Sequence, residues 1–123
     1  MRYLTDRKRA EGKGAAHTGT EYHWRITVTA VAMAFLIPTF LFILGNALGG
    51  TREEVLATFS RPFPAILTAL TFVVGMMHFK PAAEIVILDY THGSTRKLLI
   101  MLVIGLTWTL AATVLFALVK IAV

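Results

Sequence analysis

Three long apolar stretches constrain this chain of 123 residues more than any other feature. They cover about 26–48, 64–88 and 98–119, and the first and third contain no charged residue. A hydrocarbon core of ~30 Å needs about 20 helical residues to cross it, so each stretch is long enough to span a membrane. Lipid offers the backbone no hydrogen-bond partner, and such spans must therefore be α-helices. The sequence predicts an all-α integral membrane protein with three transmembrane helices.

Composition excludes several other classes of protein. Hydrophobic residues make up 56% of the chain and charged residues 15%, whereas a soluble domain carries about 25% charged residues. The chain has no cysteine, which excludes disulfides, thiolate nucleophiles and iron–sulfur ligation by the chain itself. The net charge of +5 arises from basic residues that flank the apolar stretches. This placement indicates membrane topology and membrane lipid rather than nucleic acid as the partner.

The basic residues also predict the domain organisation and the orientation. We expect residues 1–25 to form a cytoplasmic N-terminal segment and residues 26–123 to form the three-span membrane domain. Cytoplasmic flanks of membrane spans are enriched in Lys and Arg. The N-terminal segment and the second loop together hold eight such residues: Arg2, Arg7, Lys8, Arg9, Lys13, Arg25, Arg96 and Lys97. The other side holds three, namely Arg52, Arg61 and Lys120. The pattern places the N-terminus in the cytoplasm and the C-terminus in the periplasm.

The N-terminal segment and the loops add further expectations. The first 25 residues lack an apolar run, so we expect no cleavable signal peptide and a bacterial inner membrane location. Glycines at Gly45-Asn46 and Gly49-Gly50 are expected to end the first helix. The polar link over 52–63 is expected to be partly helical, and Gly93 to terminate the second helix.

Ionisable residues are unusual inside a span and are functional candidates by default. The second stretch holds His78, Lys80 and Glu84 within seven positions. Eleven residues separate His78 from Asp89 at the end of the stretch, which places the imidazole about 16 Å along the helix, near mid-membrane. Such an imidazole either donates to a carbonyl of a neighbouring helix or ligates the iron of a haem. With one such His in the chain, a bis-His haem would need a second subunit or a second copy of this chain.

Two further pairs of residues leave alternatives open. Lys80 and Glu84 are four apart and can pair along one helix face, or Lys80 reaches a cofactor propionate and Glu84 belongs to a proton path. Asp89 and Tyr90 close the second stretch. By themselves they are typical of a solvated helix end and an interfacial aromatic anchor.

The spacing from His78 to Asp89-Tyr90 and His92-Gly93 resembles that of a known family. The chain is similar to the D-type hydrophobic membrane anchor subunit of succinate dehydrogenase, a cytochrome b subunit of respiratory complex II. The stretches Gly19–Trp24 and Val28–Ala32 look like the alphaproteobacterial form of that family. The resemblance covers nearly the whole chain and includes the three-span layout.

The resemblance implies a role for each candidate residue. His78 is expected to be one axial ligand of haem b, with the second ligand from a C-type cytochrome b anchor subunit. Tyr90 is expected to hydrogen-bond a carbonyl oxygen of ubiquinone, and Asp89 to orient Tyr90. Arg25, His23 and Lys80 are candidates for contact with the haem propionates, although Thr27 stands where many relatives carry an arginine.

The resemblance also implies partners and an activity. The chain would assemble with the C-type subunit, an iron–sulfur subunit and a flavoprotein, so that FAD and iron–sulfur clusters lie in the partners. It would help to pass electrons from succinate to ubiquinone and would catalyse nothing alone. Two alternatives remain open: a cytochrome b subunit of another respiratory dehydrogenase, and a small channel or transporter protomer that uses Lys80 and Glu84.

Overall fold

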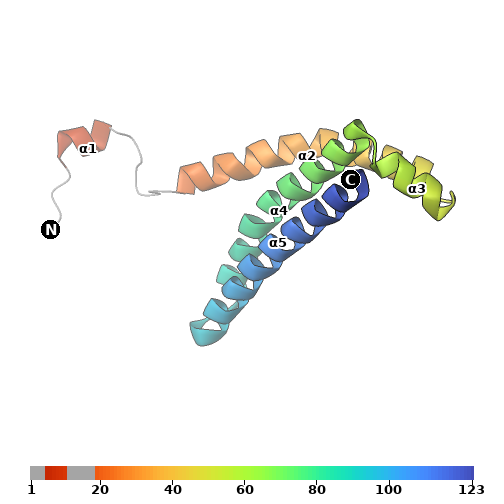
Figure 1. The fold of residues 1–123 in the computed structure, drawn as a ribbon. Coiled ribbons are helices and arrows are strands. Elements are labelled where there is room, and N and C mark those ends of the chain that lie inside the picture. Colours follow the sequence, from red (N-terminus) through yellow and green to blue (C-terminus); the bar gives the residue numbers. More distant parts are fainter. Residues whose placement is uncertain (1–4, 11–18) are drawn as a thin grey trace.

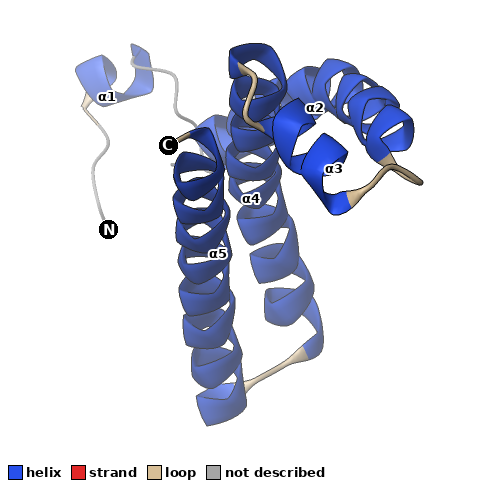
Figure 2. Ribbon diagram, turned by 45° about the vertical axis from the view of Figure 1, so that its right-hand side comes forward, coloured by secondary structure: helices blue, strands red, loops and turns tan. Residues whose placement is uncertain are grey.

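The computed structural model describes residues 5–10 and 19–123, and this part of the chain is all helical apart from short loops (Figure 2). The helices are α1 (Asp6–Ala10), α2 (Gly19–Ala47), α3 (Arg52–Phe59), α4 (Pro62–Tyr90) and α5 (Gly93–Ala122). The prediction of an all-α fold is confirmed. Two of the basic residues used for the orientation, Arg2 and Lys13, lie outside the described residues.

The three predicted spans correspond to α2, α4 and α5. These helices have 29, 29 and 30 residues and are apolar enough to cross a membrane, and at 1.5 Å per residue each is about 44 Å long. Each helix extends beyond its predicted apolar stretch. The clearest case is α2, which begins at Gly19 instead of about 26, because helical hydrogen bonding needs no apolar side chains and continues into the polar interface.

The connections differ from the predictions in detail. The polar link contains the helix α3, whose N-terminus is held by a capping box. Glu54 N–H donates to Thr51 Oγ1 at 3.3 Å, and Thr51 N–H donates to Glu54 Oε2 at 2.8 Å. Helix α2 continues through Gly45-Asn46 and ends at Ala47, and the chain turns at Gly49 with a φ of 91°, so the expected end at Gly49-Gly50 is confirmed. Gly93 begins α5 rather than ending α4, and its φ of 62° makes the tight turn between them.

The arrangement of the long helices is uneven. Figure 1 shows α4 and α5 antiparallel and side by side along their length, whereas α2 diverges from them toward its own N-terminus. The helix α3 lies at the end of the molecule where α5 finishes. Three helices in this arrangement do not close into a bundle.

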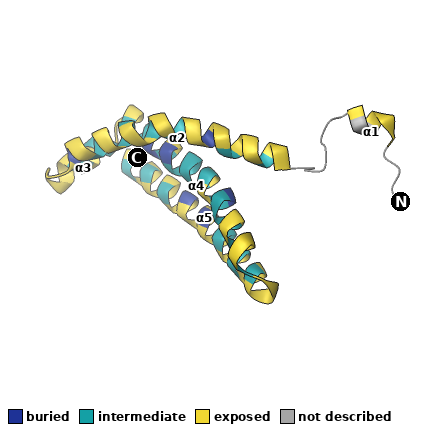
Figure 3. Cartoon of the chain, turned by 180° about the vertical axis from the view of Figure 1, so that it is seen from behind, coloured by how far each residue is buried: buried dark blue, intermediate teal, exposed yellow. Residues whose placement is uncertain are grey.

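The small core between the long helices consists of small side chains. Among the described residues the buried ones in the long helices are mostly threonine and alanine: Thr29, Ala47, Thr68, Thr71, Thr107 and Ala111. Large apolar side chains such as Phe35, Phe42 and Phe116 are exposed. Figure 3 shows exposed positions along all three long helices. Small residues let helix backbones approach closely, which is how helices associate in lipid. The exposed apolar surface is suited to lipid or to further membrane helices.

Candidate functional site

The candidate site lies where α2 crosses α4, a contact that we call the α2–α4 seam. Four contacts define it from one end to the other: Tyr22 with Glu84, Thr29 with His78, Met33 with Gly75, and Phe40 with Phe72. Residue numbers rise along α2 as they fall along α4, so the two helices are antiparallel. The absence of a side chain at Gly75 leaves room for the Met33 methyl group, which would lie 3.5 Å from an added Cβ. The seam therefore brings His78 against α2.

His78 is held through one of its two ring nitrogens. Its Nδ1 lies 3.0 Å from the hydroxyl oxygen of Thr29, whose side chain belongs to a residue only 7% exposed. Among the described residues Nε2 has no hydrogen-bond partner. The expectation of a contact with a neighbouring helix is met by a hydroxyl rather than a carbonyl.

This donor set fits a haem ligand better than a metal site built by the chain alone. A ligating His keeps one ring nitrogen for the metal while the other is fixed by the protein, and His78 has this arrangement. Within residues 5–10 and 19–123 no three His, Cys, Asp or Glu side chains cluster so as to bind a metal ion. A single free Nε2 suits haem iron whose other axial ligand comes from elsewhere.

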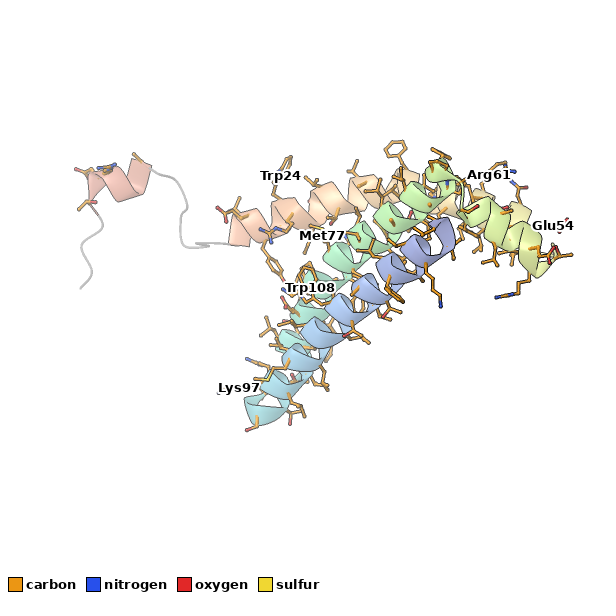
Figure 4. The ribbon with its side chains drawn as sticks, viewed as in Figure 1. Trp24, Glu54, Arg61, Met77, Lys97 and Trp108 are labelled. Carbon is orange, nitrogen blue, oxygen red and sulfur yellow. The ribbon has the colours of Figure 1, made fainter. Side chains whose placement is uncertain are left out.

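An open hollow of about 370 Å³ lies beside the seam. It is lined by Glu21, Trp24, Arg25, Val28, Thr29 and Met77, of which Trp24 and Met77 are labelled in Figure 4. Of the three residues considered for propionate contact, Arg25 lines the hollow, whereas His23 and Lys80 do not. Within the described parts of the chain the Arg25 guanidinium makes no ion pair. Arg25 is thus the candidate of the three that lines the same hollow as Thr29, the residue that contacts His78.

A second polar contact crosses the seam one to two turns beyond His78. The Tyr22 hydroxyl lies 3.0 Å from both Glu84 Oε2 and the carbonyl oxygen of Pro81. Lys80 Nζ lies 3.5 Å from Glu84 Oε1. The predicted pairing of Lys80 with Glu84 is confirmed, and Tyr22 joins it as a third member. The contact secures α2 to α4 on the side where the helices begin to diverge.

Asp89 and Tyr90 lie at the end of α4, away from His78. Tyr90 is 82% exposed, and its hydroxyl has no hydrogen-bond partner within the described residues. The twelve residues between His78 and Tyr90 correspond to about 18 Å along a helix. The structure therefore separates the two candidate functions along α4.

Arg96 fixes this end of α4. Its Nε donates to the carbonyl oxygen of Thr91 at 2.7 Å, and its Nη2 donates to the carbonyl oxygen of Leu88 at 2.9 Å. These are carbonyls that a helix C-terminus leaves without partners. From the sequence, Arg96 indicated topology alone, and this role was not predicted.

Thr29 and Tyr22 were missed as well. A hydroxyl inside an apolar span is a candidate for a hydrogen bond between helices, so Thr29 carried a signal that was not used. Tyr22 gave none, because an aromatic residue at a membrane interface is ordinary.

Comparison with known proteins agrees with this architecture. Residues 1–117 match the family described as succinate dehydrogenase/fumarate reductase transmembrane subunit. The chain is 47% identical, over 120 residues, to the succinate dehydrogenase hydrophobic membrane anchor subunit of Paracoccus denitrificans; the match covers 98% of this chain and 93% of that protein. No solved structure gives a significant match. On the family match over nearly its whole length, the chain belongs to the transmembrane subunits of succinate dehydrogenase and fumarate reductase.

Proposed function

We propose that this chain is the D-type membrane anchor subunit of a succinate:ubiquinone oxidoreductase. The observation that carries the proposal is the similarity to an anchor subunit over 98% of the chain, together with three helices of membrane-spanning length. The chain performs no chemistry alone. It holds the complex in the membrane and provides residues for a haem and for a quinone.

His78 is the residue that would hold haem b. Its Nε2 would ligate the haem iron, together with a His of a C-type cytochrome b subunit. Arg25 would neutralise a haem propionate from the hollow beside the seam. Lys80 is paired with Glu84, and a propionate contact would have to compete with that pair. When bound, the haem supplies a one-electron redox centre between the helices.

Tyr90 would bind ubiquinone at the end of α4. A phenol O–H is a hydrogen-bond donor, and the exposed Tyr90 hydroxyl is free to donate to a quinone carbonyl oxygen. Asp89 would orient Tyr90. Because Arg96 caps this end of α4, Asp89 and Tyr90 are carried on a fixed helix terminus.

The remaining chemistry belongs to partner subunits. A flavoprotein with FAD oxidises succinate, and an iron–sulfur subunit passes the electrons to ubiquinone at the membrane. The exposed apolar faces of α2, α4 and α5 would contact lipid and the C-type subunit. Nothing in the chain calls for a nucleic-acid partner.

The distribution of Lys and Arg favours an inner-membrane location with the N-terminus in the cytoplasm. A reporter enzyme that is active only in the periplasm should then be active when fused after Val123 or inserted within α3. At the α4–α5 turn, only a reporter that is active in the cytoplasm should give a signal. A cytoplasmic signal from the fusion after Val123 would contradict the orientation.

Purification of the complex through a tag on this chain tests the proposal as a whole. We expect a flavin-containing subunit and an iron–sulfur subunit to co-purify, and a b-type absorption band that dithionite reduces. A b-type band without a succinate-oxidising flavoprotein would indicate a cytochrome b subunit of another dehydrogenase. A preparation with neither would indicate a channel or transporter protomer.

A further inference from the structure

The hydroxyl of Thr29 is unusual in lying close to three polar atoms at once. Its Oγ1 is 2.9 Å from the carbonyl oxygen of Arg25, 2.9 Å from that of Ile26, and 3.0 Å from Nδ1 of His78. Carbonyl oxygens only accept hydrogen bonds, whereas a hydroxyl has one proton to donate and two lone pairs. The two carbonyls therefore compete for the single proton of Thr29.

Six other threonines, in the helices or at the end of one, show where that proton goes. In each of six cases the hydroxyl donates to the carbonyl four residues earlier, at 2.6–3.0 Å: Thr27, Thr39, Thr58, Thr71, Thr91 and Thr113. If Thr29 donated to His78 instead, two carbonyl oxygens at 2.9 Å would face its lone pairs with no proton between them. The Thr29 proton therefore stays on its own helix, and only a lone pair is left for His78.

A lone pair on Thr29 requires a proton on Nδ1 of His78. A neutral imidazole carries one proton, so Nε2 then has the free lone pair. This is the tautomer in which Nε2 can bind a metal. Thr29 is 7% exposed, so water is poorly placed to replace its oxygen as the acceptor.

We propose that Thr29 is a positioning residue that fixes the tautomer and the ring orientation of His78, so that Nε2 is presented to the haem iron. The hydrogen bonds form a relay from Nδ1–H of His78 to the Thr29 oxygen, and from the Thr29 hydroxyl to the backbone of α2. The inference rests on the proposed ligation of haem by His78. In this proposal a residue of α2, Thr29, orients a haem ligand, His78, that belongs to α4.

The relay has an electronic consequence as well as a geometric one. An acceptor at Nδ1–H raises the basicity of the imidazole, which favours ferric over ferrous iron at Nε2. Loss of the acceptor should therefore raise the midpoint potential of the haem. Loss of a hydrogen-bond partner of a metal-ligating His typically lowers metal affinity 10- to 100-fold. For a one-electron couple, a tenfold change in the preference for ferric iron shifts the midpoint potential by about 59 mV.

The experiment compares three variants of the whole purified complex by redox titration and by the low-spin electron paramagnetic resonance signal. Thr29→Val keeps the shape and removes the hydroxyl, and Thr29→Ser keeps the hydroxyl. Thr39→Val is the matched control, because Thr39 lies on the same helix and donates only to its own backbone, at 2.8 Å to Phe35 O. We expect Thr29→Val to retain haem but to lose about tenfold of its preference for ferric iron. The midpoint potential should then rise by about 59 mV, and the resonance signal should change. Thr29→Ser and Thr39→Val should match the wild type.

Two outcomes would overturn the proposal. One is a Thr29→Val complex with the same potential and resonance signal as Thr39→Val. If Thr29→Val does not assemble, Thr29→Ser decides: a potential like that of the wild type supports the relay, and a shifted potential with the hydroxyl present overturns it. His78→Ala separates this inference from the proposed function. If His78→Ala loses haem while Thr29→Val behaves like the wild type, only the role of Thr29 is overturned. If His78→Ala retains haem, the assignment of His78 as a ligand is overturned.

Discussion

The two long contacts of α4 differ in chemistry. The α2–α4 seam contains hydrogen bonds between helices, from Tyr22 to Glu84 and between Thr29 and His78. On the other side of α4 lies its contact with α5, where, away from the turn at Arg96, no side-chain hydrogen bond joins the two helices in the part of the chain that the structure describes. Thr107 shows the contrast most clearly, since it is 4% exposed and its hydroxyl has no partner among the described residues.

This difference indicates how the chain divides its tasks. Polar groups inside a membrane are costly, and helices can associate there through small residues alone. The α4–α5 contact is of that kind and serves as support. The α2–α4 seam retains an imidazole, a carboxylate and a phenol, so selection for function is the better explanation of its composition. Helix α2 diverges from α4 toward its own N-terminus (Figure 1), and an open hollow lies beside the seam.

Among substitutions that test the difference between the two contacts of α4, His78→Ala in the α2–α4 seam should have the largest effect. The change removes one of two proposed axial ligands, so the assembled complex should lose haem b or hold it weakly. The b-type absorption of the purified complex measures this. Dye reduction by the flavin-containing subunits should persist, because their chemistry lies outside the membrane. Full low-spin haem with an unchanged spectrum would contradict the assignment.

Tyr90→Phe should have the next largest effect, at the end of α4 beyond both contacts. Phe keeps the ring and removes the O–H that we propose to donate to ubiquinone. A donor at a centre that gains charge is worth ~3 kcal/mol, about a hundredfold in rate, and a weaker one ~1 kcal/mol, about fivefold. Succinate-dependent quinone reduction should therefore fall between fivefold and a hundredfold, with haem content unchanged. Equal rates at low and at saturating quinone would remove Tyr90 from the site.

The sequence predicted the features that one helix can encode. Continuous apolar runs specify the spans, and the position of His78 within its run specifies its depth. The capping box at Thr51 and Glu54 was not predicted but could have been, because it is a local pattern of four residues. The partner of His78 was not readable, since it depends on the crossing angle and register of α2 against α4. A shift of one residue along α2 would turn Thr29 away from the imidazole, and nothing local in either helix fixes that register.

Tyr22→Phe tests whether the second polar contact of the seam adds stability. It removes the hydroxyl that lies 3.0 Å from both Glu84 Oε2 and Pro81 O. Hydrogen bonds between membrane helices average about 0.6 kcal/mol and reach about 1.7 kcal/mol, so the thermal midpoint of the purified complex should fall slightly. Tyr90→Phe is the matched control, because its hydroxyl is exposed and has no partner among the described residues. A larger loss in the control than in Tyr22→Phe would show that the seam contact carries no stability.

The smallest effect should come from Thr107→Val, on the opposite side of α4. The same substitution at Thr29 removes an oxygen with three polar neighbours, whereas at Thr107 it removes an oxygen without a hydrogen-bond partner among the described residues. The burial of Thr107, midway along α5, comes from α4, because α5 otherwise contacts only α3 near its far end. A buried hydroxyl without a partner costs free energy, and its replacement by a methyl group of similar shape is neutral or stabilising by up to about 1 kcal/mol. The thermal midpoint should stay the same or rise, and the haem potential should not move. A loss of stability as large as that of Tyr22→Phe would mean that Thr107 gains a hydrogen-bond partner in the assembled complex, and the α4–α5 contact would then no longer be the apolar counterpart of the seam.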